Sequence, residues 1–146
     1  MGMGIMTRVT AVALALLLAP ALARAEVPVR VRVLKAARGG PAQVDPRLKD
    51  LQKQLGKLAY QRWEQVSEQR LTMVPGKTQF VPLPDGENAG VTVQEVRGTS
   101  VTVEVALAQR NTMSRLTVDK GQRIVHQVVP EKNGVAYFVT VLAWPE

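Results

Sequence analysis

Side chains that could perform nucleophilic catalysis are few in this chain, and their spacing forms no recognisable unit. His126 is the single histidine, so an imidazole base would have to be this residue. It lies within 124–128, inside a predicted strand, where a ring that has a polar partner or faces solvent is favoured. The serines, Ser67, Ser100 and Ser114, lack the Gly-x-Ser-x-Gly setting of a nucleophile elbow. The sequence therefore predicts no catalytic residue among them.

Paired carboxylates could hydrolyse glycosidic bonds, one acting as acid and the other as base or nucleophile. Asp85 and Glu87 share a turn, and Glu64 and Glu68 lie near each other in the sequence. A wall-polymer hydrolase therefore remains an alternative function. The simpler interpretation is that Asp85 serves a Pro-Asp-Gly turn and that the glutamates lie on solvated faces.

Metal and cofactor chemistry have no recognisable motif here. The chain has no cysteine and a single histidine, and its carboxylates are scattered without ligand spacing. Neither a Gly-x-Gly-x-x-Gly fingerprint nor a phosphate-binding lysine loop is present. We therefore expect no metal, no cofactor and no disulfide.

Basic residues are the more suggestive feature. Arg30 and Arg32 lie on one face of a predicted strand, and Lys49, Lys53 and Lys57 are four residues apart on a predicted helix. These five residues form a candidate face for anionic lipid, anionic wall polymer or an acidic protein partner. The alternative is a solvated surface that only keeps the protein soluble. Nucleic acid is disfavoured because aromatic residues, which would stack on bases, are few.

The N-terminus predicts export. Arg8 precedes an uncharged apolar run at 9–19, Pro20 follows, and Ala23-Arg24-Ala25 offers the small residues of a cleavage site. Cleavage before Glu26 would remove a signal peptide, 1–25. The alternative is a retained membrane anchor, but the apolar run is near half of the roughly 20 residues that a spanning helix needs.

The predicted mature chain, 26–146, is long enough for one domain and keeps 17 basic and 12 acidic residues. With no transmembrane segment left after cleavage, it is expected to be periplasmic, associated with the outer membrane or extracellular. Absence of cysteine rules out an N-terminal lipid anchor on a cysteine and requires the apolar core to hold the fold.

Alternating valines open this domain. Val27, Val29, Val31 and Val33 share one face, and Pro28 suits the start or the edge of a sheet. We therefore predict that these four valines belong to an edge strand, which could accept a strand of a partner through backbone hydrogen bonds.

One amphipathic helix is expected over about 46–59. Asp45 can cap it, and Pro46 suits its first position. Its apolar stripe consists of Leu48, Leu51, Leu55 and Leu58. Beyond it, turn signals separate about seven strand-like runs, of which 135–144 is apolar on both faces and therefore central. The expected fold is α+β but mainly β, an antiparallel β-sandwich or partly closed barrel with one packed helix.

A motif at the helix start resembles that of a family of small exported bacterial envelope proteins. It reads Val44-Asp45-Pro46-Arg47-Leu48, between a valine-rich strand and an amphipathic helix. The glycine turn at Gly121 and the hydrophobic strand at 135–141 are similar to that family's C-terminal, β-rich half. The resemblance implies the fold and an envelope location, with no assigned chemistry. It also implies that the chain is similar to accessory parts of secretion or surface-motility machines.

Three functional hypotheses remain. The first is a non-enzymatic cell-envelope protein that binds a protein partner as an accessory subunit. The second is a carrier of anionic ligands, such as lipopolysaccharide or wall polymer, through the basic face. The third is the hydrolase considered above.

Overall fold

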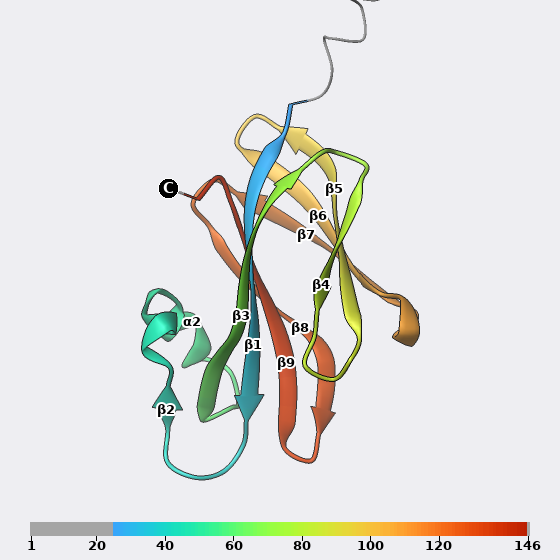
Figure 1. The fold of residues 1–146 in the computed structure, drawn as a ribbon. Helices are drawn as coiled ribbons and strands as arrows, with labels where there is room; N and C mark the ends of the chain where they lie inside the picture. The colour runs from blue at the N-terminus through green and yellow to red at the C-terminus, as the bar shows by residue number, and fades with distance from the viewer. Residues whose placement is uncertain (1–24, 146) are drawn as a thin grey trace, which may run out of the picture.

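The computed structural model describes residues 25–145, so the predicted signal peptide lies outside the described residues except for Ala25. Two β-sheets pack face to face (Figure 1). Sheet A has the strand order β2-β3-β1-β9-β8, and sheet B has the order β4-β5-β6-β7. The predicted mainly β sandwich with one packed helix is confirmed, and the barrel alternative is not the arrangement found.

Sheet A consists of β1 (Val27–Ala37), β2 (Gln43–Val44), β3 (Arg62–Met73), β8 (Arg123–Lys132) and β9 (Val135–Ala143). Sheet B consists of β4 (Thr78–Pro82), β5 (Asn88–Arg97), β6 (Ser100–Leu107) and β7 (Thr112–Asp119). The helical segments are the 3₁₀ turns η2 (Pro46–Leu51) and η3 (Ala108–Arg110) and the α-helix α2 (Gln52–Leu55). All ladders are antiparallel except the short pairing of β2 with β3.

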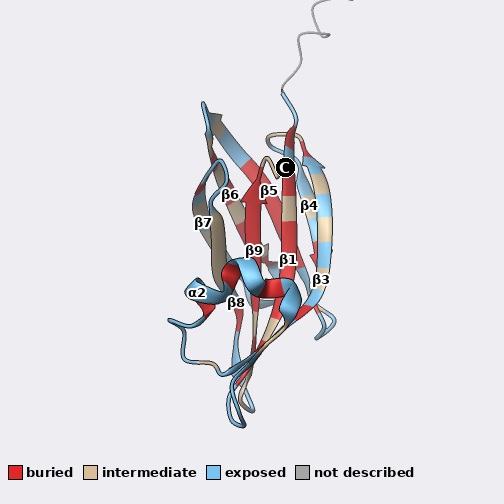
Figure 2. Cartoon of the chain, turned by 90° about the vertical axis from the view of Figure 1, so that its left-hand side faces the viewer, coloured by how far each residue is buried: buried red, intermediate tan, exposed pale blue. Residues whose placement is uncertain are grey.

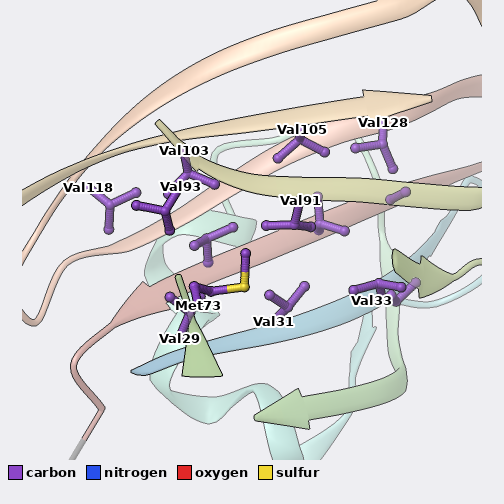
Figure 3. Packing of buried hydrophobic residues seen from close by; sticks show 14 of the residues in the cluster. Val29, Val31, Val33, Met73, Val91, Val93, Val103, Val105, Val118 and Val128 are labelled. Atoms are coloured by element: carbon purple, nitrogen blue, oxygen red, sulfur yellow. The ribbon is translucent and has the colours of Figure 1, made fainter. Parts of the chain in front are cut away.

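The main core lies between the two sheets and is built largely from valine (Figure 3). Every second residue of a strand points to the same face, so the alternating valines of β1 meet those of β5 and β6. Branched side chains suit this pleated interior, and the core needs no disulfide to form. Val31 and Val103, one from each sheet, are fully buried.

A second, smaller core lies on the other face of sheet A. Leu48, Leu51 and Leu55 pack there against Trp63 and Phe138. Figure 2 shows the helical segment crossing this face, with both buried and exposed residues along it, and the buried leucines pack on the sheet. Sheet A is therefore covered on both sides at this end.

The helix is shorter than predicted. It begins at Pro46, with Asp45 Oδ1 accepting a hydrogen bond from the backbone of Arg47 at 3.0 Å, but it ends at Leu55 rather than at residue 59. Leu48 has non-helical dihedral angles, and Gly56, which has a high entropic cost in a helix, follows at once. Leu58 consequently leaves the predicted stripe and is 38% exposed.

The prediction that Val27, Val29, Val31 and Val33 form an edge strand is wrong. β1 lies between β3 and β9, and all four valines are buried in the main core. Pro28 does not prevent this placement, because the ladder with β9 begins at Val29 and the Pro28 carbonyl still accepts the Trp144 N–H at 2.8 Å. The prediction for the last strand is confirmed, since β9 pairs on both sides and contributes to both cores.

Candidate functional site

Arg30 and Arg32 do not lie on a free basic face. The side chain of Arg32 is 5% exposed and donates to both carboxylate oxygens of Asp50, at 3.2 Å from Nη1 and 2.7 Å from Nη2. Arg30 lies 3.4 Å from Glu68 and 3.9 Å from Asp50. Arg123, from β8, also binds Asp50 at 2.7 Å. These arginines therefore bind the helix to the sheet.

The electrostatics of Asp50 follow from this geometry. Partial burial acts to raise the pKa of Asp50, but the hydrogen bonds and charges of Arg32 and Arg123 outweigh it, so that this pKa lies below its usual value. The carboxylate stays ionised, as three neighbouring guanidinium groups require.

Lys49, Lys53 and Lys57 are exposed, and no ion pair involves their side chains within residues 25–145. Lys57 lies beyond the end of α2, so the expected helical row is shorter than predicted. The structure thus divides the predicted basic face into two arginines with carboxylate partners and three lysines without them.

The residues considered for catalysis line different hollows, two of which adjoin each other at Arg110 and Pro130. His126 lines one of about 560 Å³, together with Ser114 and Thr112, between the edge strands β7 and β8. Burial lowers the pKa of His126. Asp85 and Glu87 line a neighbouring hollow of about 600 Å³.

The two carboxylates of that neighbouring hollow have a basic partner. Arg110 binds Glu87 at 2.7 Å and lies 3.7 Å from Asp85. Burial opposes ionisation of Asp85, but hydrogen bonds with Glu87 and the charge of Arg110 leave the pKa of Asp85 lowered.

The remaining candidates are also dispersed. Ser100 donates its hydroxyl hydrogen to Asp119, and Glu68 pairs with Arg30. Glu64 lines a third hollow, of about 410 Å³, beside Lys35 and Trp63. Within residues 25–145, no group of three or more histidine, cysteine or acidic side chains could hold a metal ion.

An apolar row crosses the outer face of sheet B, and the sequence reasoning did not find it. Phe80 lies opposite Gly90, Gly90 opposite Ala106, and Ala106 opposite Met113, so one residue from each strand takes part. We call these four residues the apolar row. Phe80 is 66% exposed and Met113 is 58% exposed, whereas the two central residues are small.

The centre of the apolar row is a place of close approach. A Cβ atom on Gly90 would lie 3.2 Å from Thr78 Cγ2 and 3.4 Å from Phe80 Cε1, so the Phe80 ring leans over the glycine backbone. The sequence did contain a signal for this surface. Phe80 and Met113 are large apolar residues at the outward-facing positions of their strands, where polar side chains are expected.

Polar contacts border the apolar row on one side. Thr78 and Thr92 share a hydroxyl hydrogen bond of 2.6 Å. Glu104 accepts from Gln94 at 2.8 Å and lies 3.9 Å from Arg115. This border therefore carries little uncompensated charge.

The chain matches no protein-family model, and comparison with curated proteins and with solved structures finds no significant similarity. The resemblance to small envelope proteins accordingly stays a prediction. Among the described helices, none has both the length and the apolar character needed to cross a membrane.

Proposed function

We propose that this chain is an exported, non-enzymatic protein of the cell envelope that docks a protein partner, as an accessory subunit of a larger assembly. The observation that supports this function is the apolar row on sheet B. Two large apolar side chains, Phe80 and Met113, remain exposed to solvent there, and the small residues Gly90 and Ala106 lie between them. Association with a protein surface would remove them from solvent.

The surroundings of the apolar row indicate the chemistry of the partner. Between Phe80 and Met113 a partner could place an apolar side chain against the Phe80 ring, which covers Gly90, and against the methyl group of Ala106. On one side of the apolar row, the threonine pair and the compensated Glu104 favour a polar rim with little net charge. A hydrophobic centre within a polar rim is the usual anatomy of a protein interface.

The roles of the charged groups also favour binding over the hydrolase hypothesis. Arg110 compensates the carboxylates of Asp85 and Glu87, and His126 lines an adjoining hollow rather than theirs. Asp50 and its arginines connect structural elements. These carboxylates and arginines thus have partners within the chain that do not depend on a substrate.

Site-specific photo-crosslinking in intact cells tests the docking surface. A photoreactive residue at Ala106 should capture an envelope protein, whereas the same residue at Thr102, on the same strand and face, should not. Phe80→Ser or Met113→Ser should lower the yield at Ala106, and Val66→Ser, which removes an exposed apolar side chain on sheet A, should leave it unchanged. Equal capture at Thr102, or a yield unaffected by Phe80→Ser, would contradict the proposal.

Export has its own test. N-terminal sequencing of the protein recovered from the envelope fraction should begin at Glu26. Recovery of uncleaved protein from the cytoplasm would contradict both the export signal and the envelope location.

A second candidate function is binding of an anionic polymer or lipid headgroup through Lys49, Lys53 and Lys57. The observation in its favour is that these exposed lysines lack carboxylate partners within the described chain. Binding to vesicles that contain anionic lipid should weaken with salt and disappear when all three lysines are changed to glutamine. Binding that persists in the triple variant would exclude this function.

A further inference from the structure

The outer edge of β3 is covered at two places and open between them. Near its start, Gln65 N–H donates to Asp45 Oδ2 at 3.0 Å, and its carbonyl accepts from Arg47 Nη2 at 3.1 Å. Near its end, the carbonyl of Thr72 accepts from Gln79 Nε2 at 2.9 Å. Between these contacts, no strand of the described chain pairs with the outer side of residues 66–71. We call residues 66–71 the open edge.

The register of the ladder identifies the backbone groups that face outward there. In an antiparallel pair, alternate residues direct their N–H and C=O groups toward the neighbouring strand. The contacts of Gln65 show that its groups point away from β1, and a bulge between Val33 and Leu34 shifts the alternation by one residue. Glu68, Arg70 and Thr72 therefore direct their backbone groups outward, as the contact of Gln79 with Thr72 confirms.

On the open edge, Arg70 has no carboxylate partner within the described chain. Arg70 lies directly opposite Arg30 in the β1–β3 ladder, and like charges in that relation repel each other. Arg30 has Glu68 and Asp50 nearby, but Arg70 forms no ion pair with any residue from 25 to 145. A carboxylate supplied from outside the molecule would compensate it.

We propose that a second copy of this chain pairs with the open edge, antiparallel, across a two-fold axis at Gln69. Glu68 of each copy then lies opposite Arg70 of the other. The outward backbone groups of these residues face each other and can form hydrogen-bonded pairs, which extend sheet A from one molecule into the next.

The charges select this register over its neighbours. Shifting the axis to Glu68 would set two glutamates against each other, and shifting it to Arg70 would set two arginines against each other. Only the axis at Gln69 makes both cross-strand pairs opposite in charge. The order Glu-x-Arg is self-complementary when antiparallel, which is why a second copy fits better than an unrelated strand.

The pairing is expected to be concentration dependent. A short edge ladder buries less surface than the roughly 1,200–2,000 Å² of stable complexes. The open edge is a different surface from the apolar row, so a dimer would present two apolar rows. A protein that does not dimerise would therefore leave the proposed function intact.

Sedimentation velocity of the purified protein over a concentration series tests the dimer. The wild type should shift from monomer to dimer as concentration rises. Glu68→Arg and Arg70→Glu should each stay monomeric, because each places like charges opposite each other. An equimolar mixture of these two variants should dimerise, since every cross-strand pair is then again opposite in charge. The double exchange E68R/R70E should also dimerise.

Covalent trapping supplies a second measurement, because the chain has no cysteine. Gln69→Cys places one thiol beside the two-fold axis, within disulfide reach of its copy, and should give a crosslinked dimer on oxidation. Thr117→Cys, an exposed position on β7, should give much less. Circular dichroism of each variant establishes that it is folded.

Three results would overturn the proposal. They are a wild type that stays monomeric throughout the series, charge-reversed variants that dimerise as well as the wild type, and a mixture that fails to dimerise although both variants are folded. Capture of an unrelated protein at the open edge, without self-association, would also exclude the second copy as its occupant.

Discussion

Arg32 and Asp50 are joined by two hydrogen bonds, at 3.2 Å and 2.7 Å, that link β1 to the 3₁₀ turn lying across it. The guanidinium also donates to the Arg47 carbonyl at 3.3 Å and to Thr140 Oγ1 at 3.4 Å. A charge expected to face solvent thus lies in a buried network between a strand and a helical turn.

Asp50→Asn should destabilise the fold. The substitution keeps the shape but removes the negative charge that compensates the nearly buried Arg32, and Arg30 and Arg123 also lose it. We expect a loss of about 2 kcal/mol in the free energy of unfolding, measured by urea denaturation. Glu95→Gln, which affects only the exposed pair with Arg97, should cost less than about 0.5 kcal/mol. Equal effects of the two substitutions would contradict the structural role of Asp50.

Acid should weaken the fold through the same carboxylate. The pKa of Asp50 is lowered in the folded protein, so its contribution is complete above the unfolded pKa and is lost as pH falls through the folded pKa. The pKa of Asp45 is also lowered, chiefly by its hydrogen bond with the Arg47 side chain. Thermal midpoints should therefore fall below about pH 4, and less steeply in Asp50→Asn than in the wild type. If the thermal midpoints of the wild type and of Asp50→Asn fell equally steeply with pH, Asp50 would not be the carboxylate responsible.

Leu55→Ala and Leu58→Ala should separate the observed helix from the predicted one. Leu55 is fully buried against the second core, and its truncation should cost about 3 kcal/mol. Leu58 lies beyond α2 and is 38% exposed, so its truncation should cost less than about 1 kcal/mol. Similar losses in chemical denaturation would mean that the helix continues to residue 59.

Gly90→Val should disturb the apolar row more than the fold. Its side chain would meet Thr78 Cγ2 and Phe80 Cε1, and the exposed Phe80 ring can swing away. Unfolding free energy should change by about 1 kcal/mol or less, because β-branched residues suit strands. Crosslinking from Ala106 should nevertheless fall strongly. A variant that is folded and captures its partner normally would show that the surface over Gly90 is not used.

Period-two valine patterns predicted the faces of the strands well, because alternation is a local property of the chain. Which strands flank a given strand is not local. Val29 and Val31 were correctly expected to share a buried face, but the placement of β1 between β3 and β9 depends on residues far along the sequence. One hint was present in the sequence. On the face of β1 that points away from the main core, the residue type changes from arginine at Arg32 to leucine at Leu34, where the helix covers the sheet.

The candidate sites were harder to predict for the same reason. Sequence shows Arg32 and Lys49 only as positive charges, whereas the crossing of the helix decides that Arg32 meets Asp50. The apolar row requires the registers of three ladders, and no single strand contains that information. Large apolar residues at outward-facing positions, such as Phe80 and Met113, can indicate that such a surface exists. They do not show which residues of the neighbouring strands lie beside them.

Because the domain has two separate cores, its two tryptophans report on different events. Trp63 is buried in the small core beneath the helical segment, whereas Trp144 packs against the main core between the sheets. Single-tryptophan forms would thus let intrinsic fluorescence follow undocking of the helical segment and separation of the sheets as independent optical signals within one polypeptide.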